Sequence, residues 1–396
     1  MSVVPIDQGR ARGSQRTITA FGIPASGWDW WLAGSALAIL SIGTLLVWSA
    51  TATNEVLTQG HQNAYLIKNL TNVAIGLLLA LGVVLIDHRW VRILTPALYL
   101  LSVVGLILVL VVGSTINGSR SWLLLGGLSV QPAEFAKLAV ICAMAIIVAE
   151  RVENNGHRPV ASSDALLMLG VAGLPALLIL LQPDLGTVMI LAATVFATLA
   201  VAGTPRRWLL GLLVGGVGSV VTVAQVGLLK QYQVDRFLAF TNPSLDPQGA
   251  GYNTAQARIA IGNGGLWGQG LFAGSQTRSG FVPEQHTDFI FTVAGEELGL
   301  LGAGVLILLF GVLLWRALLI ARRSTDLFGR VTAAGVACWL GFQSFQSIGM
   351  CLGIMPVTGV PLPLVSYGGS SLFATLLAIG LLLNIAHRQH RDQLYP

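Results

Sequence analysis

Long apolar stretches recur along the whole chain, and they limit what it can fold into. A helix needs about 20 apolar residues to cross the hydrocarbon core of a bilayer. Only 10% of the 396 residues are charged, against about 25% in soluble globular proteins. This composition excludes a disordered chain, a secreted disulfide scaffold and a nucleic-acid-binding protein. The sequence predicts an all-α, polytopic membrane protein with ten transmembrane helices at 31–50, 67–86, 93–113, 132–149, 163–181, 184–202, 207–227, 286–314, 329–351 and 370–386.

The positions of the basic residues predict how the ten spans are oriented. Cytoplasmic segments of membrane proteins carry an excess of Lys and Arg. Ten spans put both termini on one side, and a cytoplasmic N-terminus places most of the 22 Lys and Arg residues in cytoplasmic segments. We therefore expect a multi-pass protein of the plasma (inner) membrane with cytoplasmic tails at 1–30 and 387–396. Its single transmembrane domain, 31–386, includes a large extracytoplasmic loop at 228–285 between spans seven and eight.

Polar residues are costly inside a membrane span, and a first group of them, in segment 131–137, opens the fourth span. Pro132 suits the first turn of a helix, where its missing N–H group is not needed. Glu134 and Lys137 are three residues apart, so they share a helix face and can form an ion pair. One interpretation is a structural pair that closes the helix bundle. The other is a lysine held near a functional site, with its charge facing a polar cavity.

A second segment, 281–297, opens the eighth span with four carboxylates, which packing alone hardly explains. Pro283 predicts the entry to the helix, so that Glu284 and Asp288 lie four residues apart on one face. Asp288 then lies just below the extracytoplasmic surface, where it can act as a general base. Alternatively, it is the proton-relay or ion site of a transporter. His286 is either a hydrogen-bonded surface histidine or a catalytic one.

The third segment, 353–371, is rich in proline and glycine and cannot form a regular membrane helix. Irregular backbone at membrane depth is tolerated only when it is buried in protein or lines a cavity. Free backbone N–H groups at the start of the tenth span suit an anion such as a phosphate, which makes Ser370 a candidate substrate contact. A re-entrant hairpin that only fills space is the alternative.

Six segments together resemble the SEDS (shape, elongation, division and sporulation) family, to which RodA and FtsW belong, and follow its order along the chain. They are NGSRSW (117–122), QPAEFAKL (131–138), QPDLGT (182–187), DRFLAFTNPSLDPQGAGYNTAQARIAIGNGGLWGQG (235–270), PEQHTDFIFTVAGEELG (283–299) and PVTGVPLPLVSYGGSS (356–371). The resemblance implies ten membrane helices and a peptidoglycan glycosyltransferase that polymerises lipid II in cell elongation or division. The short termini and the wording FVPEQHTDF favour a RodA-like member.

The resemblance also assigns roles to single residues. Asp288 takes the place of the family's essential aspartate, and Glu134 and Lys137 match its charged pair on the fourth span. Trp122 and Arg120 lie in the loop that carries a functional tryptophan. The chain departs from the family there, because one residue separates the arginine from the tryptophan.

The implied chemistry is inverting glycosyl transfer with an undecaprenyl diphosphate leaving group. Asp288 is the expected base, and Lys137 either stabilises the leaving diphosphate or orients Asp288. Further candidate substrate contacts are Arg236, Arg258, Arg278, Glu284 and His286. Three cysteines in apolar runs make a metal framework improbable, so we expect no metal site, although a divalent cation is an optional cofactor.

The expected partners are lipid II, a class B penicillin-binding protein transpeptidase and other wall-synthesis membrane proteins. The alternative function is a lipid II flippase or transporter, since helices broken by Pro and Gly at membrane depth also characterise transporter sites. Flipping requires charges near the midplane of the bilayer. Here the charges gather toward the extracytoplasmic ends of the spans, so the sequence favours a polymerase with an extracytoplasmic active site.

Overall fold

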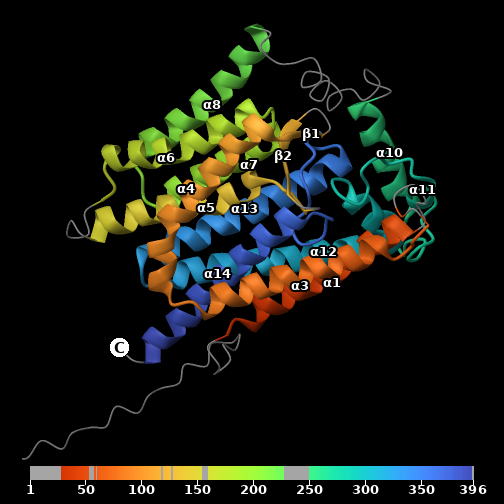
Figure 1. Cartoon of the computed structure of the whole chain (residues 1–396), viewed down its shortest axis with the longest axis horizontal. Coiled ribbons are helices and arrows are strands. Elements are labelled where there is room, and N and C mark those ends of the chain that lie inside the picture. The colour runs from red at the N-terminus through yellow and green to blue at the C-terminus, as the bar shows by residue number, and fades with distance from the viewer. Residues whose placement is uncertain are drawn as a thin grey trace, which may run out of the picture.

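The computed structural model describes residues 28–52, 58, 60–116, 119–125, 128–153, 159–226 and 249–394. Within these ranges ten helices of 17 or more residues run side by side along the molecule (Figure 1). They are α1 (Trp30–Ala52), α3 (Ala64–Leu85), α4 (His88–Val112), α5 (Pro132–Glu153), α6 (Ser162–Leu181), α7 (Leu185–Val201), α8 (Arg206–Val226), α12 (Ile290–Arg323), α13 (Leu327–Leu352) and α14 (Gly369–Leu394). Each predicted apolar stretch coincides with one of them. Seven are long and apolar enough to cross a membrane, so the chain is a mostly helical, polytopic membrane protein.

Aspartates begin three of these helices. Asp87, Asp184 and Asp326 each accept a hydrogen bond of 3.0–3.3 Å from a backbone N–H group in the first turn of α4, α7 and α13. A carboxylate at this position satisfies a free amide and interacts favourably with the helix dipole. The turn that contains Asp184 is tight, because α6 ends at Leu181 and α7 begins at Leu185.

A small antiparallel sheet accompanies the helices of this all-α fold. Its strands are β1 (Ser114–Ile116), β2 (Ser119–Leu125) and β3 (Leu128–Val130), in the order β1-β2-β3. Ser114 pairs with Trp122, and Leu123 pairs with Val130. Strands of three to seven residues show too little alternation to stand out beside long apolar runs.

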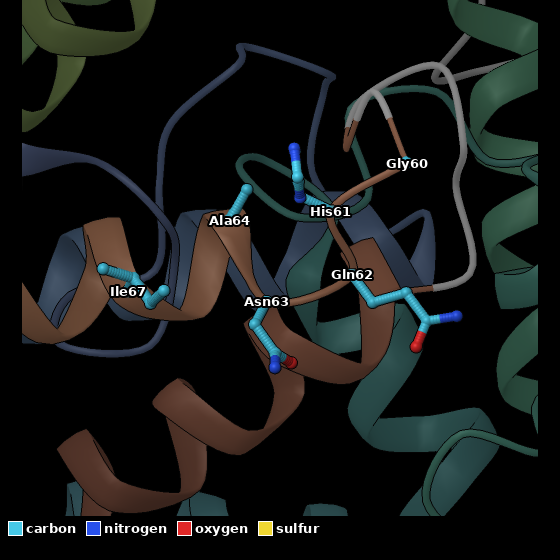
Figure 2. A pocket seen from close by; sticks show the side chains of 6 residues that line it. All are labelled: Gly60, His61, Gln62, Asn63, Ala64 and Ile67. Atoms are coloured by element: carbon cyan, nitrogen blue, oxygen red, sulfur yellow. The ribbon is translucent and has the colours of Figure 1, made fainter.

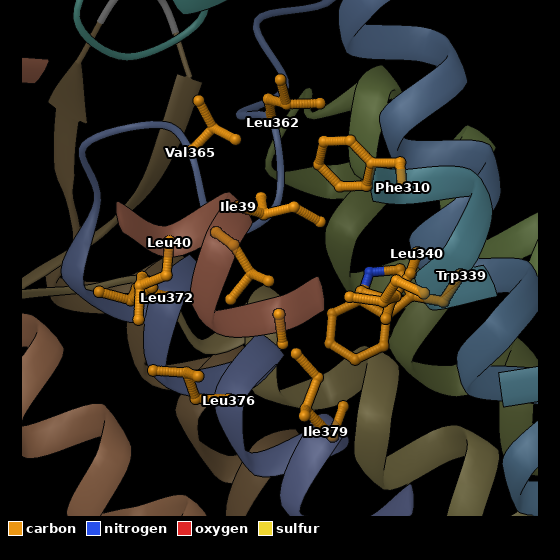
Figure 3. Packing of buried hydrophobic residues seen from close by; sticks show 14 of the residues in the cluster. Ile39, Leu40, Phe310, Trp339, Leu340, Leu362, Val365, Leu372, Leu376 and Ile379 are labelled. Atoms are coloured by element: carbon orange, nitrogen blue, oxygen red, sulfur yellow. The ribbon is translucent and has the colours of Figure 1, made fainter. Parts of the chain in front are cut away.

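The centre of the bundle lies where α1, α12, α13 and α14 meet the irregular segment 354–368. Side chains from all five pack together there (Figure 3), among them Ile39, Phe310, Trp339, Leu362 and Leu376. Small residues let the backbones approach closely, as is usual between membrane helices. A Cβ atom at Gly43 of α1 would lie only 2.5 Å from the Cα atom of Val365, so α1 rests directly on the irregular segment.

Helix α12 is interrupted at Gly299, whose φ of 67° and ψ of −170° are not helical. The carbonyl groups of Glu296 and Glu297, which the break releases, accept hydrogen bonds of 3.0 Å from amides of the loop 264–270. Two amides after the break donate back to loop carbonyls at 2.9 and 3.2 Å. Backbone polar groups at membrane depth need such partners. The loop supplies them on both sides of the break in α12.

The side chains of Glu296 and Glu297 anchor the same loop. The Glu296 carboxylate accepts four hydrogen bonds of 2.7–3.2 Å from residues 275–277, at the start of α11 (Ser275–Ser279). The Glu297 carboxylate accepts one of 2.7 Å from Ser49, whose hydroxyl in turn accepts the Phe272 amide at 2.9 Å. Two of the four carboxylates that the sequence offered as functional therefore hold the loop in place.

The large loop is partly helical. α10 (Ala250–Asn263) and α11 gather at one end of the molecule, and the C-terminal end of α14 lies at the other (Figure 1). Residues 228–248 of the predicted loop lie outside the described residues.

We expect Gly268→Ala to destabilise the protein. Gly268 has a φ of 81°, and a Cβ atom there would lie 2.1 Å from the Glu297 carbonyl oxygen, so the loop would have to leave the break in α12. Strained backbone of this kind costs about 1–3 kcal/mol, which should lower the melting temperature in detergent. Gly304→Ala is the control, because it lies in α12 with open space around its Cβ position. Equal shifts in both variants would contradict the role of the loop.

Candidate active site

A fully buried lysine lies near the middle of the bundle. Lys137 in α5 has 0% exposure. Its ammonium group donates to Glu134 Oε1 and to Gln343 Oε1 of α13, both at 2.8 Å, and lies 5.0 Å from the centre of the Trp339 ring. The predicted ion pair is confirmed. Of the two carboxylates expected to pair with Lys137, Glu134 is its partner.

Helix α13 connects this ion pair to the irregular segment 354–368. The amide of Gln343 donates to the Pro361 carbonyl oxygen at 2.9 Å. One turn further along, Gln346 donates to Thr358 Oγ1 at 2.7 Å. Buried amides without partners are costly, so these two glutamines fix the irregular backbone on the protein interior, as the sequence predicts for such a segment.

Asp288 lies against the same irregular segment. A Cβ atom at Gly359 would be 3.1 Å from Asp288 Oδ2, which places the carboxylate on the Gly359 backbone. Gly359 has a φ of 69°, a conformation that few side chains tolerate. The half-buried Asp288 thus contacts segment 354–368 directly. The Lys137–Glu134 pair is linked to the same segment through α13.

The position of Asp288 corrects one structural prediction. α12 begins at Ile290 rather than near Pro283, so Asp288 lies in a turn before the helix and not inside it. Glu284 has a φ of 51°, and its carbonyl accepts the amides of the next residues, 287–289, at 3.1–3.2 Å. This left-handed residue prevents the helix from starting earlier. Glu284 and Asp288 therefore do not share a helix face.

His286 occupies the same turn and is half-buried beside the rings of Tyr65 and Tyr367. Burial lowers the pKa of His286, and the negative charge of Glu284 only partly opposes this shift. The imidazole is therefore neutral at pH 7. Glu284 is exposed and accepts a hydrogen bond of 3.1 Å from the Thr287 hydroxyl.

Arg120 makes contacts that the sequence did not indicate. Its guanidinium donates to the carbonyl oxygens of Gly113, Leu110 and Val111 at 2.8, 3.1 and 3.3 Å. It therefore caps the C-terminal end of α4, where carbonyl groups lack helical partners. Trp122, two residues along β2, is half-buried.

Ser370 at the start of α14 is buried and bonded within the protein. Its hydroxyl accepts from the Gln131 amide at 3.0 Å and donates to the Ser129 carbonyl at 3.1 Å. The Gln131 side chain donates to Asp184 at 3.2 Å. Ser370 thus joins α14 to β3 and to the start of α5, and its hydroxyl is engaged within the protein.

The three predicted phosphate contacts of the large loop are placed differently. Arg258 in α10 is exposed, and its side chain lies beside Gly353, where α13 ends. Arg278 in α11 is also exposed. Arg236 lies outside the described residues. Arg258 is therefore the arginine of this set that the structure brings close to the irregular segment.

Four residues near the site were not predicted from the sequence: Gln343, Gln346, Tyr65 and Tyr367. The two glutamines are polar residues within an apolar stretch, a signal that the sequence contains. The two tyrosines sit at the edges of their spans, where aromatic residues are common, so nothing in the sequence distinguishes them.

A pocket of about 540 Å³ opens at the start of α3 and is lined by Gly60, His61, Gln62, Asn63, Ala64 and Ile67 (Figure 2). The site residues predicted from the sequence do not line it. In the part of the chain that the structure describes, no group of three or more His, Cys, Asp or Glu side chains could hold a metal ion.

Comparison with known proteins places the chain among cell-wall proteins. A family model described as "Cell cycle protein", which covers FtsW, RodA and SpoVE, matches residues 30–391. Peptidoglycan glycosyltransferase MrdB of Escherichia coli is 37% identical over 354 residues, which are 89% of this chain and 92% of that protein. Stage V sporulation protein E of Bacillus subtilis is 36% identical over 357 residues, 88% of this chain and 94% of that protein.

Solved structures agree with these relatives. The rod shape determining protein RodA of Thermus thermophilus has a TM-score of 0.66 and 33% identity, and the match covers 93% of this chain and 98% of that one. A chain from a peptidoglycan synthase complex that coordinates polymerization and crosslinking has a TM-score of 0.76 and 35% identity, and it covers 93% of this chain and 99% of its own.

Lys137→Met should destabilise the protein. The substitution leaves the Glu134 carboxylate buried without its counter-charge, which costs roughly 3–5 kcal/mol. The double variant Glu134→Gln, Lys137→Met removes both charges and should recover much of this loss in a thermal melt. Lys68→Met, at an exposed lysine, is the control. If the single and double variants melt at the same temperature, the ion pair does not stabilise the bundle.

Proposed function

The chain belongs to the FtsW, RodA and SpoVE family, and from that premise we propose that it polymerises lipid II with Asp288 as general base. It is a peptidoglycan glycosyltransferase, the activity named for its relative MrdB of Escherichia coli, at 37% identity. It acts in cell elongation or division. The role of Asp288 rests on one observation: its carboxylate contacts the irregular segment 354–368. The Lys137–Glu134 pair is linked to the same segment by hydrogen bonds through α13.

The reaction joins two lipid II molecules. The 4-hydroxyl of one GlcNAc attacks C1 of the MurNAc on the other molecule, and the bond from C1 to the undecaprenyl diphosphate oxygen breaks. The configuration at C1 changes from α to β. Asp288 accepts the proton of the attacking hydroxyl, a contribution worth about 10²–10⁴-fold in rate. The turn suits this role, since it leaves Asp288 half-buried just before the first residue of α12.

Lys137 orients the site. Its ammonium group is fully buried and bonded to Glu134 and Gln343, which supports the orienting role over direct contact with the leaving diphosphate. We assign the diphosphate charge to the exposed Arg258 and Arg278 and to backbone amides at the start of α14. Arg236, which lies outside the described residues, stays a candidate from the sequence. Groups that meet charge where it develops lower the barrier most. Trp122 and Glu284 are the remaining proposed substrate-side residues.

A class B penicillin-binding protein transpeptidase is the proposed partner. The similar chain from a synthase complex that coordinates polymerization and crosslinking supports this pairing. We also propose that all ten long helices span the membrane, that both termini are cytoplasmic, and that Asp288 faces the extracytoplasmic side. The gathering of α10, α11 and the start of α12 at one end of the bundle (Figure 1) is consistent with this arrangement.

Asp288→Asn should abolish glycan synthesis. The amide keeps the shape of the side chain but cannot accept the proton, so purified variant protein should bind lipid II yet yield no polymer on a gel. Asp87→Asn makes the same chemical change at an exposed helix cap and should leave polymerisation intact. Polymer at the wild-type rate from Asp288→Asn would refute the base and favour the transporter alternative.

The orientation can be tested by thiol labelling. With Cys142, Cys338 and Cys351 replaced by Ala, Ser279→Cys in α11 should react with an impermeant maleimide added outside intact spheroplasts. Thr325→Cys, exposed in the turn between α12 and α13, should react only after lysis. The reverse pattern would overturn the proposed topology.

A further inference from the structure

Three rings from distant parts of the chain meet next to Asp288. Tyr65 belongs to α3, His286 to the turn before α12, and Tyr367 to the end of the irregular segment. The Tyr65 ring centre lies 5.4 Å from His286 and 5.0 Å from Tyr367, and the remaining pair is 5.9 Å apart. Edge-to-face and tilted ring pairs at these distances are attractive.

The backbone reinforces this contact. The Tyr367 amide donates to the His286 carbonyl oxygen at 2.9 Å, so the irregular segment and the turn before α12 are joined by the main chain as well as by the rings. Within the turn, the amides of Thr287, Asp288 and Phe289 all donate to the Glu284 carbonyl. The turn therefore moves as one piece, and a shift of His286 displaces Asp288.

The turn is held on three sides. Gln285 is buried and donates to the carbonyl groups of Ala50 and Thr277 at 3.0 and 2.9 Å. The Asp288 carboxylate lies on Gly359. His286 is the third anchor, and its ring contacts supply the link to α3 and to the end of segment 354–368.

We propose that Tyr65, His286 and Tyr367 form a positioning cluster that fixes the turn 284–289 and so holds Asp288 in place for proton transfer. This inference rests on the proposed function of Asp288. The cluster acts through its rings, and neither the imidazole nor the tyrosine hydroxyl groups take part in the chemistry. Burial lowers the pKa of His286, and the charge of Glu284 in the turn opposes this shift. The Lys68 ammonium lies over the Tyr65 ring, 5.4 Å from its centre.

Substitutions that keep or remove each ring test this role. His286→Ala and Tyr367→Ala should lower kcat for lipid II polymerisation about 10- to 100-fold, the loss expected when a reacting group is displaced by about 1 Å. KM should change less than twofold. His286→Phe and Tyr367→Phe keep the rings and should retain most of kcat, and the acidic limb of the pH–rate profile should stay where it is in the wild type.

Each alternative gives a different result. If His286→Phe is as inactive as His286→Ala, the imidazole takes part in proton transfer and the positioning role is wrong. Tyr99→Ala removes a half-buried ring of α4, a helix that contributes no residue to the cluster. It therefore controls for general instability. If Tyr99→Ala loses as much kcat as the two cluster alanine variants, and melts at the same temperature as they do, the cluster has no special role.

The same assay separates this inference from the proposed function. Full activity of both alanine variants beside an inactive Asp288→Asn would refute the cluster and leave Asp288 as the base. Activity of Asp288→Asn would refute both.

Discussion

The ammonium group of Lys137 must find its partners inside a low-dielectric bundle, and much of the architecture follows from that need. An unpaired buried charge costs several kcal/mol, so Glu134 of the same helix supplies the counter-charge and Gln343 of α13 supplies a second acceptor. Gln343 also binds Pro361 through its other amide atom. One buried charge therefore fixes α5 against α13 and, through α13, fixes the irregular segment. Asp288 packs on that segment.

Irregular backbone is the second constraint, because a membrane protein tolerates it only where other groups complete its hydrogen bonds. This chain uses it twice around Asp288. The break at Gly299 is filled by the loop 264–270, and the segment 354–368 is bound by the glutamines of α13. The short part of α12 between the turn and the break is thereby held from both sides.

The sequence predicts the parts of this arrangement that depend on local spacing. Long apolar runs locate the helices, and the three-residue spacing of Glu134 and Lys137 predicts their ion pair. Prediction from the sequence fails where the conformation of a single residue or contacts between distant residues decide the structure. The start of α12 moves to Ile290 because Glu284 adopts a left-handed conformation, and Arg120 caps α4 because the strands turn it back. Neither the sheet contacts nor the positive φ angle leave a periodic signal in the sequence.

These contacts also divide the cations into two groups with different uses. Lys137 and Arg120 are bonded to protein groups and are therefore part of the scaffold. Arg258 and Arg278 are exposed on α10 and α11, and these helices are anchored to α12 through the loop and the Glu296 carboxylate. The two arginines proposed to bind the leaving diphosphate are thus attached to the part of α12 that directly follows Asp288. Base and cations share one support, so a movement of that support changes both sides of the proposed reaction together.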